Sequence, residues 1–249
     1  MSLLTLQGVS HSYFGRKVLD GIGFSIGEGE VVSLVGPSGS GKSTIAHIAA
    51  GLITPRSGRI TRGYRHHAMV FQEPRLMPWA TVAGNIAFPL KMAHVPRETR
   101  VSRVLAAALA AGLMPEDLDK YPVELSGGMR QRSAIARALV TEPDFLYFDE
   151  PFTALDVALK RRMQDLVIAA AAAARFSALF ITHDLMEAIR ISHRILVLDP
   201  MGQGITGERI IAGDPATRSE PSVFAQREAF LGEDPLFAHI HDLDERLRP

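Results

Sequence analysis

Cysteine is absent from this chain of 249 residues. Its absence excludes disulfide bonds, thiolate metal sites and cysteine nucleophiles. An excess of either charge is also lacking, because 27 Lys and Arg side chains balance 27 Asp and Glu side chains. A balanced chain offers no electrostatic reason to bind nucleic acid or an anionic membrane surface. No nucleic-acid partner is therefore expected.

Long hydrophobic runs are missing as well. The apolar, Ala-rich stretch Leu166–Ala174 falls well short of the about 18 residues that a membrane span needs. The N-terminal segment Met1–Arg16 lacks the charged-then-apolar layout of a signal peptide. The sequence therefore predicts a cytosolic protein. If it serves a membrane process, another polypeptide supplies the membrane spans.

Short β-rich runs alternate with helical stretches, which predicts an α/β fold with a mostly parallel sheet. The first thirty residues and the region Ile60–Phe71 indicate short strands with Gly-rich turns, and hence a small antiparallel sheet beside the core. The region from about Trp79 to Val140 lacks convincing strands and is expected to be helical. The expected buried strands are Val31–Val35, Phe145–Phe148, Ala178–Thr182 and Arg194–Asp199, and the expected helices include Ser43–Ala50, Thr99–Ala111, Gly128–Leu139 and Met163–Ala174.

A glycine-rich segment follows the first buried strand and opens a helix. It reads Gly36-Pro37-Ser38-Gly39-Ser40-Gly41-Lys42-Ser43, which fits G-x-x-x-x-G-K-[ST] in the strand–loop–helix context that this motif requires. Glycines let backbone N–H groups curl around phosphate oxygens, and the helix N-terminus adds partial positive charge. Lys42 is expected to reach the terminal phosphates and the Ser43 hydroxyl to ligate Mg²⁺. Thr44 completes the expected phosphate-binding set.

A pair of carboxylates at a strand end is the second candidate for the same chemistry. The buried strand Phe145–Phe148 runs directly into Asp149 and Glu150. Asp149 can hold Mg²⁺ through its water shell, and Glu150 can polarise the water that attacks the γ-phosphate. Acidic residues at strand ends are common, so this pair gains its meaning from the phosphate loop expected in the same core.

The single asparagine of the chain constrains the choice of nucleotide. Guanine recognition by N-K-x-D needs an Asn followed by Lys, yet Asn85 is followed by Ile86. A GTPase of that type is excluded, and the expected cofactors are ATP and Mg²⁺.

A short segment decides the family. It reads Leu125-Ser126-Gly127-Gly128-Met129-Arg130-Gln131-Arg132, and its Ser-Gly-Gly before a helix is a second anion-binding helix start, able to hold a γ-phosphate. A P-loop, then L-S-G-G-x-x-Q-R, then a hydrophobic strand ending in Asp-Glu is the signature set of ABC ATPases. The chain resembles that family over roughly residues 3 to 215.

The resemblance implies roles for further residues. Tyr13 resembles the aromatic residue that stacks on adenine, although it can also simply pack the small sheet. Ala154-Leu155-Asp156 resembles the D-loop, which crosses the dimer interface, and Asp156 is counted with the nucleotide-binding residues. The implied catalytic residues are Glu150, the Q-loop glutamine Gln72 and the switch histidine His183, and the implied metal ligands are Ser43, Gln72 and Asp149.

The resemblance also implies an architecture. A P-loop NTPase (RecA-like) core carries a small antiparallel β subdomain and an inserted helical subdomain, about 72–140, with the signature loop. Together they form a single ABC ATPase domain over 1–249, with a C-terminal tail at about 215–249. The implied partner is a second copy of the chain, because in head-to-tail dimers of the family the Lys42 loop of one chain and the Ser126 loop of the other close on one ATP.

The segment after the Q-loop glutamine is similar to one group within the family. Phe71–Trp79 resembles the F-Q-x-x-x-L-L-P-W segment of bacterial importer ATPases of the nitrate, sulfonate and taurine type. In that group the region lies beside the groove for the permease's coupling helix, so Leu76–Trp79 is the expected permease contact. Packing of Trp79 inside the helical subdomain is the alternative. The group implies uptake of a small anionic solute, such as a sulfonate or nitrate. It also implies a place at the cytoplasmic face of the inner membrane through the permease, and an indirect role for a solute-binding protein.

The sequence leaves open which solute is transported and whether the chain is a transporter subunit or a soluble ABC ATPase. Relatives often carry Arg-Pro-Gly after the last core strand, whereas Asp199–Gly204 stands there in this chain. The alternative function is a soluble ABC ATPase. The stretch between Lys42 and Leu125 is too short for the coiled-coil insertion of DNA-repair types, and translation types usually carry two cassettes. Iron–sulfur assembly ATPases are similar in size. An inactive scaffold conflicts with the presence of every catalytic-type residue.

Overall fold

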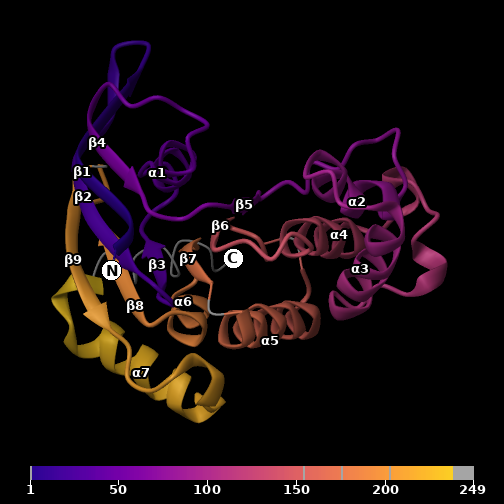
Figure 1. The fold of residues 1–249 in the computed structure, drawn as a ribbon. Coiled ribbons are helices and arrows are strands. Elements are labelled where there is room, and N and C mark those ends of the chain that lie inside the picture. Colours follow the sequence, from indigo (N-terminus) through magenta and orange to yellow (C-terminus); the bar gives the residue numbers. More distant parts are fainter. Residues whose placement is uncertain (1, 154, 175, 202, 238–249) are drawn as a thin grey trace.

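The central feature of the fold is a six-stranded sheet of order β5-β6-β7-β3-β8-β9, in which every pairing except β8 with β9 is parallel (Figure 1). The computed structural model describes residues 2–153, 155–174, 176–201 and 203–237. The strands of this sheet are β3 (Val31–Val35), β5 (His67–Val70), β6 (Phe145–Asp149), β7 (Ser177–Ile181), β8 (Arg194–Leu198) and β9 (Ile205–Ile210).

Helices connect the parallel strands, so the predicted α/β class is confirmed. The predicted buried strands are all present and differ from the observed ones only at their ends. The same is true of the helix predicted after the phosphate loop, whereas the helix predicted from Met163 begins earlier, at Val157. The helices around the sheet are α1 (Lys42–Ala49), α5 (Val157–Ala174), α6 (Leu185–Ile191) and α7 (Glu220–Glu233), with short 3-10 turns η3 (Pro215–Thr217) and η4 (Pro235–Phe237).

A separate antiparallel sheet of order β2-β1-β4 lies beside the core, as expected (Figure 1). It contains β1 (Ser2–Tyr13), β2 (Arg16–Gly27) and β4 (Ser57–Arg62). The expectation that all of Ile60–Phe71 belongs to this sheet is wrong. The region divides after β4, and β5 pairs in parallel with β6, with His67 opposite Phe145. A short apolar run does not specify its partner strand, so the sequence alone could not assign β5 to the core.

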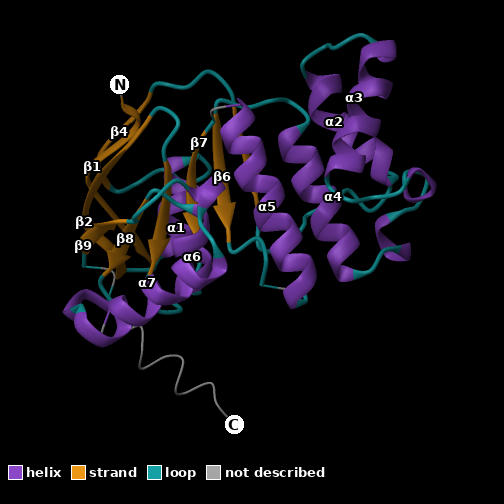
Figure 2. Ribbon diagram, turned by 90° about the horizontal axis from the view of Figure 1, so that it is seen from below, coloured by secondary structure: helices purple, strands orange, loops and turns teal. Residues whose placement is uncertain are grey.

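Alternation along the buried strands divides the core between the two faces of the large sheet. Val32 and Leu34 of β3 pack on the face covered by α1 and the small sheet. Val31 packs on the opposite face, against Met163 and Val167 of α5. Figure 2 shows α5 lying across this second face. Strands with helices or sheets on both faces are hydrophobic throughout, which is why they were recognisable in the sequence.

Three helices form a layer of their own at one end of the molecule (Figure 1). Their shared core is built from apolar side chains such as Val82, Ile86 and Leu90 on α2 and Val104 on α3. No strand lies among them in the described residues. The layer consists of α2 (Val82–Met92), α3 (Arg97–Ala110) and α4 (Gly127–Leu139), with 3-10 turns η1 (Pro115–Asp117) and η2 (Pro122–Glu124).

The region after Met201, predicted only as a C-terminal tail from about residue 215, adds an edge strand and a helix. β9 pairs antiparallel with β8, and α7 packs on α6 through Val223, which is buried with Ile189 and Phe237. Across the described parts of the chain, no helix has both the length and the apolar character to cross a membrane.

Candidate functional site

Four neighbouring parallel strands end at one edge of the large sheet, and each delivers a predicted site residue there. The order β5-β6-β7-β3 places Gln72 just after β5, Asp149 and Glu150 at the end of β6, His183 just after β7, and the phosphate loop after β3. The carboxyl ends of parallel strands share one edge, so residues far apart in the sequence meet there.

The phosphate loop, Gly36–Ser43, joins β3 to α1. Gly41 precedes the helix and has a φ of 97°, in the left-handed region that favours glycine. A Cβ atom at this position would lie 2.7 Å from Leu19 Cδ2 and 3.2 Å from Val18 Cγ1 of β2. The left-handed backbone therefore favours glycine at 41, and the close approach of β2 leaves little room for a side chain there. The N-terminus of α1 at this point favours a bound anion.

Lys42 is buried beneath this loop, with only 4% of its surface exposed. Its Nζ donates hydrogen bonds to Gly36 O at 2.7 Å and to Pro37 O at 2.8 Å. Burial lowers the pKa of Lys42, and the charges of Glu150 and Asp149 oppose that shift. An ammonium group has three donors, so two can brace the loop while the third meets a phosphate oxygen.

Two side chains with oxygen atoms that could hold a metal ion meet at the end of the phosphate loop. Ser43 Oγ donates a hydrogen bond of 2.8 Å to Asp149 Oδ1, and His47 Nε2 lies 3.4 Å from Asp149 Oδ2. Mg²⁺ prefers oxygen ligands at about 2.0–2.1 Å in an octahedron, which places neighbouring ligand atoms about 2.9 Å apart. The spacing and chemistry of Ser43 and Asp149 therefore fit the ion that accompanies ATP.

Glu150 is the centre of a polar cluster. Its Oε2 lies 3.4 Å from Gln72 Nε2 and 3.2 Å from His183 Nδ1, and Thr153 Oγ1 is 3.5 Å away. The backbone of Glu150 is left-handed, with φ of 45°, and its N–H donates to Ile181 O at 3.0 Å. The hydrogen bond from His183 lowers the pKa of Glu150, which keeps the carboxylate ionised and able to orient water. All three predicted catalytic residues thus lie together.

The Glu150–His183 pair predicts a measurable titration. The hydrogen bond to Glu150 raises the pKa of His183 above its ordinary 6.5. Because the folded-state pKa is raised, the stability from His183 is fully present below about pH 6.5 and is lost as the pH rises through the raised value. The contribution of Glu150, whose pKa is lowered, is lost instead as the pH falls through that lowered value. NMR titration of the His183 ring should give a pKa above 6.5, and Glu150→Gln should bring it down. An unchanged titration in that variant would contradict the pairing.

The signature segment stands at the start of α4. Ser126 caps α4, its Oγ accepting a hydrogen bond of 3.2 Å from Met129 N, and in the described part of the chain no hydrogen bond joins Ser126 to the phosphate loop. Gly128 contacts the start of α5, because a Cβ at 128 would lie 2.7 Å from Leu159 Cδ2 and 3.7 Å from Leu155 Cδ2. The predicted D-loop therefore touches the signature helix of its own chain.

The D-loop itself runs into α5. Asp156 is exposed, and its Oδ1 accepts a hydrogen bond of 2.9 Å from Leu159 N in the first turn of the helix. Ala154, named with this loop in the sequence analysis, lies outside the described residues. The described part of the D-loop thus presents a surface carboxylate at the N-terminus of a long helix.

Comparison with known proteins decides which family this arrangement represents. The ABC transporter family matches residues 19–153 of the chain. This chain belongs to the ABC transporter family. The aliphatic sulfonates import ATP-binding protein SsuB 1 of Nocardia farcinica is 40% identical over 229 residues, which cover 92% of this chain and 90% of that protein. The SsuB protein of Corynebacterium glutamicum is 38% identical over 229 residues, covering 92% of each chain.

Solved structures give the same result for this ABC cassette. A dimeric ATP-binding cassette in a post-hydrolysis state, bound to ADP and Pi, matches with a TM-score of 0.78 at 30% identity, over 84% of this chain and 99% of that one. A dimeric bacterial ABC transporter cassette matches with a TM-score of 0.79 at the same identity and coverage. The prediction of an ABC ATPase with a P-loop fold is confirmed, and the chain is an ATP-binding and ATP-hydrolysing cassette.

The candidate adenine contact of the cassette lies at the tip of the small sheet. Tyr13 ends β1, is 39% exposed, and meets His11 edge to face with ring centroids 4.7 Å apart. It pairs with Arg16 at the start of β2, a few residues from Val18, which approaches Gly41 of the phosphate loop. The position therefore suits stacking on a base beside the phosphate loop, and the role of Tyr13 stays a prediction.

The segment between β5 and α2 exposes the only tryptophan. Trp79 is 76% exposed, so it does not pack inside the helical layer, whereas Leu76 packs against that layer's core. The shape of the segment depends on Asn85, which is fully buried on α2. The Asn85 amide accepts from Met77 N at 2.7 Å and donates to backbone carbonyls of the same segment at 3.0–3.2 Å.

Asn85 and Arg137 are functional candidates that the sequence analysis missed. The Arg137 guanidinium of α4 donates to Pro74 O and Arg75 O, both at 2.9 Å, so it fixes the beginning of the segment that Asn85 fixes at its end. A polar residue at the buried positions of an apolar helix must find partners. That rule could have identified Asn85, whereas the partner of Arg137 is visible only in three dimensions.

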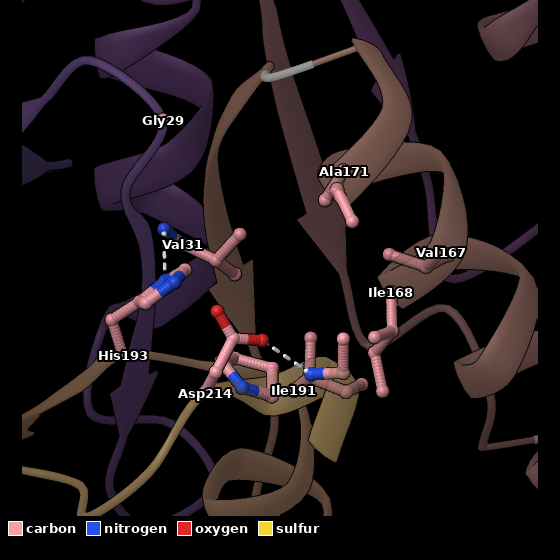
Figure 3. A pocket seen from close by; sticks show the side chains of 11 residues that line it. Gly29, Val31, Val167, Ile168, Ala171, Ile191, His193 and Asp214 are labelled. Carbon is pink, nitrogen blue, oxygen red and sulfur yellow. Dashed lines mark hydrogen bonds between the residues drawn. The ribbon is translucent and has the colours of Figure 1, made fainter.

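A cavity of about 260 Å³ lies at the opposite edge of the large sheet (Figure 3). Val167 and Ile168 of α5 form one wall, and His193, whose Nδ1 accepts a hydrogen bond of 3.0 Å from Val31 N, forms another. Gly29 and Val31 stand at the amino end of β3, whereas the phosphate loop follows its carboxyl end. The cavity is therefore separate from the nucleotide site.

Proposed function

We propose that this cassette hydrolyses Mg²⁺-ATP to energise the import of a small anionic solute, an aliphatic sulfonate first of all, through a separate permease. The observation that carries the proposal is the meeting of Lys42, Asp149, Glu150 and His183 at one sheet edge. It is supported by curated relatives, 37–40% identical over most of the chain, that are named as sulfonate import ATP-binding proteins. These relatives favour import over the soluble iron–sulfur assembly alternative.

The residues divide the chemistry among them. Lys42 would neutralise the γ-phosphate from beneath the phosphate loop, in a setting with little water, where such a charge has a large effect. Ser43 and Asp149 would hold Mg²⁺, with Gln72 contacting its water shell. When bound, the ion would neutralise charge on the β- and γ-phosphate oxygens. Glu150 would orient the attacking water, and His183 would contact the γ-phosphate through Nε2 while its Nδ1 faces Glu150.

A second copy of the chain would complete each site. Ser126 lies at the N-terminus of α4, where a γ-phosphate would be stabilised by the helix dipole and by backbone N–H groups. In one chain this segment makes no hydrogen bond with the described phosphate loop, and the similar solved cassettes are dimers. A head-to-tail dimer, with the Ser126 segment of one chain over the Lys42 loop of the other, accounts for both observations.

The permease would dock on the exposed segment Leu76–Trp79. Trp79 offers a large amphipathic side chain at the surface, of the kind enriched in the energetically important centre of interfaces. The hydrogen bonds from Asn85 and Arg137 to the backbone of this segment hold it in one conformation before docking. Through this contact the cassette would sit at the cytoplasmic face of the inner membrane, while a solute-binding protein acts from the other side.

Transport by the assembled complex tests the proposal. The cassette, its permease and the solute-binding protein are placed in liposomes with ATP inside, and uptake of a labelled alkanesulfonate is compared with uptake of nitrate and taurine. Sulfonate uptake that depends on ATP and stops with Glu150→Gln is the expected result. Uptake of nitrate or taurine instead would correct the solute. Absence of uptake with every solute would contradict the import function.

Replacing Trp79 tests the docking surface. We expect Trp79→Ala to change the stability of the isolated cassette by no more than about 0.5 kcal/mol, because the side chain is exposed. The free energy of binding to the permease should become less favourable by about 2 kcal/mol or more. Phe224→Ala on α7, where an aromatic ring is 55% exposed, is the matched control and should retain permease binding. Unchanged binding by Trp79→Ala in a pull-down would place the interface elsewhere.

A further inference from the structure

The first turn of α5 bears a lysine that reaches across to α6. Lys160 follows the D-loop Asp156 by one helical turn, and its backbone N–H donates to Asp156 O at 2.8 Å. Its Nζ lies 2.6 Å from Asp184 Oδ2 and 3.1 Å from Glu187 Oε1. Asp184 is the residue directly after the switch histidine, so one side chain spans from the D-loop helix to the His183 segment.

Glu187 extends this contact to the other side of His183. Only 4% of Glu187 is exposed, and its Oε2 accepts a hydrogen bond of 2.5 Å from Thr182 Oγ1. Gln164 of α5 donates to Glu187 Oε1 at 3.3 Å, and Asp184 N donates to Thr182 Oγ1 at 3.0 Å. Both neighbours of His183 in the sequence are thus fixed by the same network.

The charges of the network depend on the lysine. Burial raises the pKa of Glu187 against the opposing charge of Lys160. Although burial acts to lower it, the pKa of Lys160 is raised by Glu187 and Asp184. A buried carboxylate that loses its cation is strongly destabilised. Lys160 therefore supplies the positive charge that stabilises Glu187 in its buried position, and it pairs with Asp184 as well.

The same turn of α5 also contacts the signature helix. Leu159, the residue before Lys160, lies against Gly128 at the start of α4, so a Cβ atom at 128 would force the end of the Leu159 side chain to move. In the proposed dimer, the signature segment serves the ATP of the partner chain, and His183 serves the ATP of its own chain. The first turn of α5 is the place where these two elements of one chain meet.

We propose that Lys160 is a positioning residue that holds the His183 segment in a fixed position relative to the first turn of α5. A movement of that turn would then be transmitted to the switch histidine. This proposal rests on the proposed ATPase role of His183. No atom of Lys160 needs to touch the nucleotide. The lysine acts through the backbone on either side of His183, where a displacement of about 1 Å can cost a factor of about 100 in rate.

Steady-state kinetics of the permease-bound complex test this role. Lys160→Met should lower kcat by about tenfold to a hundredfold, with KM for ATP changed by no more than about twofold, because the phosphate loop is untouched. The lysine lines a groove of about 770 Å³ between α5, α6 and α7, so an arginine can be accommodated. Lys160→Arg should restore most of kcat because it keeps the cation between the two carboxylates.

A second ion pair between the same helices supplies the matched control. Arg190 of α6 pairs with Asp165 of α5, away from the residues that flank His183. Arg190→Met should lower the thermal unfolding midpoint by less than Lys160→Met, because the Asp165 side chain is 55% exposed, while kcat stays near the wild-type value. Equal loss of kcat in both variants, or no rescue by Lys160→Arg, would reduce Lys160 to a structural residue and overturn the proposal.

Two further measurements keep the result unambiguous. If Lys160→Met fails to fold, Asp184→Asn is the second variant. It removes one charge of the network but keeps an oxygen to cap α6, and kcat should again fall at nearly constant KM; wild-type kcat in this variant would overturn the proposal.

Failure of the proposed function is recognised separately. A wild-type complex that does not hydrolyse ATP contradicts that function, whereas a normal wild-type complex with fully active Lys160→Met contradicts the positioning role alone.

Discussion

Lys42→Ala is expected to lower ATP hydrolysis by the assembled complex about a thousandfold, which corresponds to about 4 kcal/mol of lost transition-state stabilisation. The ammonium is buried beneath the phosphate loop, where low dielectric strengthens its attraction to the γ-phosphate. The variant also removes the donors to Gly36 O and Pro37 O, so loop geometry and nucleotide affinity should suffer as well. Phosphate release and ATP binding are the measurements.

The matched control is a lysine whose contacts lie outside the site. Lys120 pairs with Asp117 in the helical layer, 2.6 Å away, and Lys120→Ala should leave hydrolysis intact, because its contacts do not reach the phosphate loop. Lys42→Arg keeps the positive charge at this position but changes the shape of the side chain. It therefore tests the contribution of side-chain geometry separately from that of charge. Near wild-type turnover by Lys42→Ala would remove Lys42 from the nucleotide site.

The parts of the cassette that could be predicted are those encoded within one short segment. The phosphate loop favours glycine at 41, where the backbone is left-handed, and its lysine is the next residue. A motif of eight consecutive residues therefore specifies the whole phosphate-binding loop. Strand β6 is equally self-contained, because an apolar run ends at Asp149 and Glu150. Such motifs are recognisable because neighbours in sequence are also neighbours in space.

The features that escaped prediction are contacts between distant segments. The sequence predicts β5 beside the small sheet because a short apolar run does not indicate its partner strand, and only the register with β6 assigns it to the core. Arg137 and Lys160 each stand on an amphipathic helix, where a long cation usually indicates a solvated face. Their partners, Pro74 O and Asp184, lie on other elements, so no local pattern could reveal them.

Glu150→Gln should produce the clearest phenotype of any substitution in the chain. Glutamine keeps the size of the side chain and can still accept from Gln72, but the negative charge that orients and polarises water is gone. The loss of this base should slow hydrolysis at least about a thousandfold while ATP binding is preserved. Glu142→Gln is an unusually close control, because Glu142 also has a left-handed backbone, with φ of 50°, and pairs with a cation, Arg103, at 2.9 Å.

Because Glu150→Gln binds ATP without consuming it, the ATP-bound dimer should accumulate. Size-exclusion or sedimentation should find two chains together in ATP and separate chains in ADP or without nucleotide. Adding Ser126→Arg to the same chain should dissolve that dimer, since a bulky cation at the N-terminus of α4 opposes the helix dipole and blocks the contact with the γ-phosphate. Where the permease is needed to hold two cassettes together, the same comparison is made within the complex, by trapping labelled ATP. Wild-type hydrolysis by Glu150→Gln in that complex would refute the assignment of Glu150 as the catalytic base. A dimer that persists in the presence of Ser126→Arg would refute the head-to-tail arrangement. The two assignments are therefore tested separately.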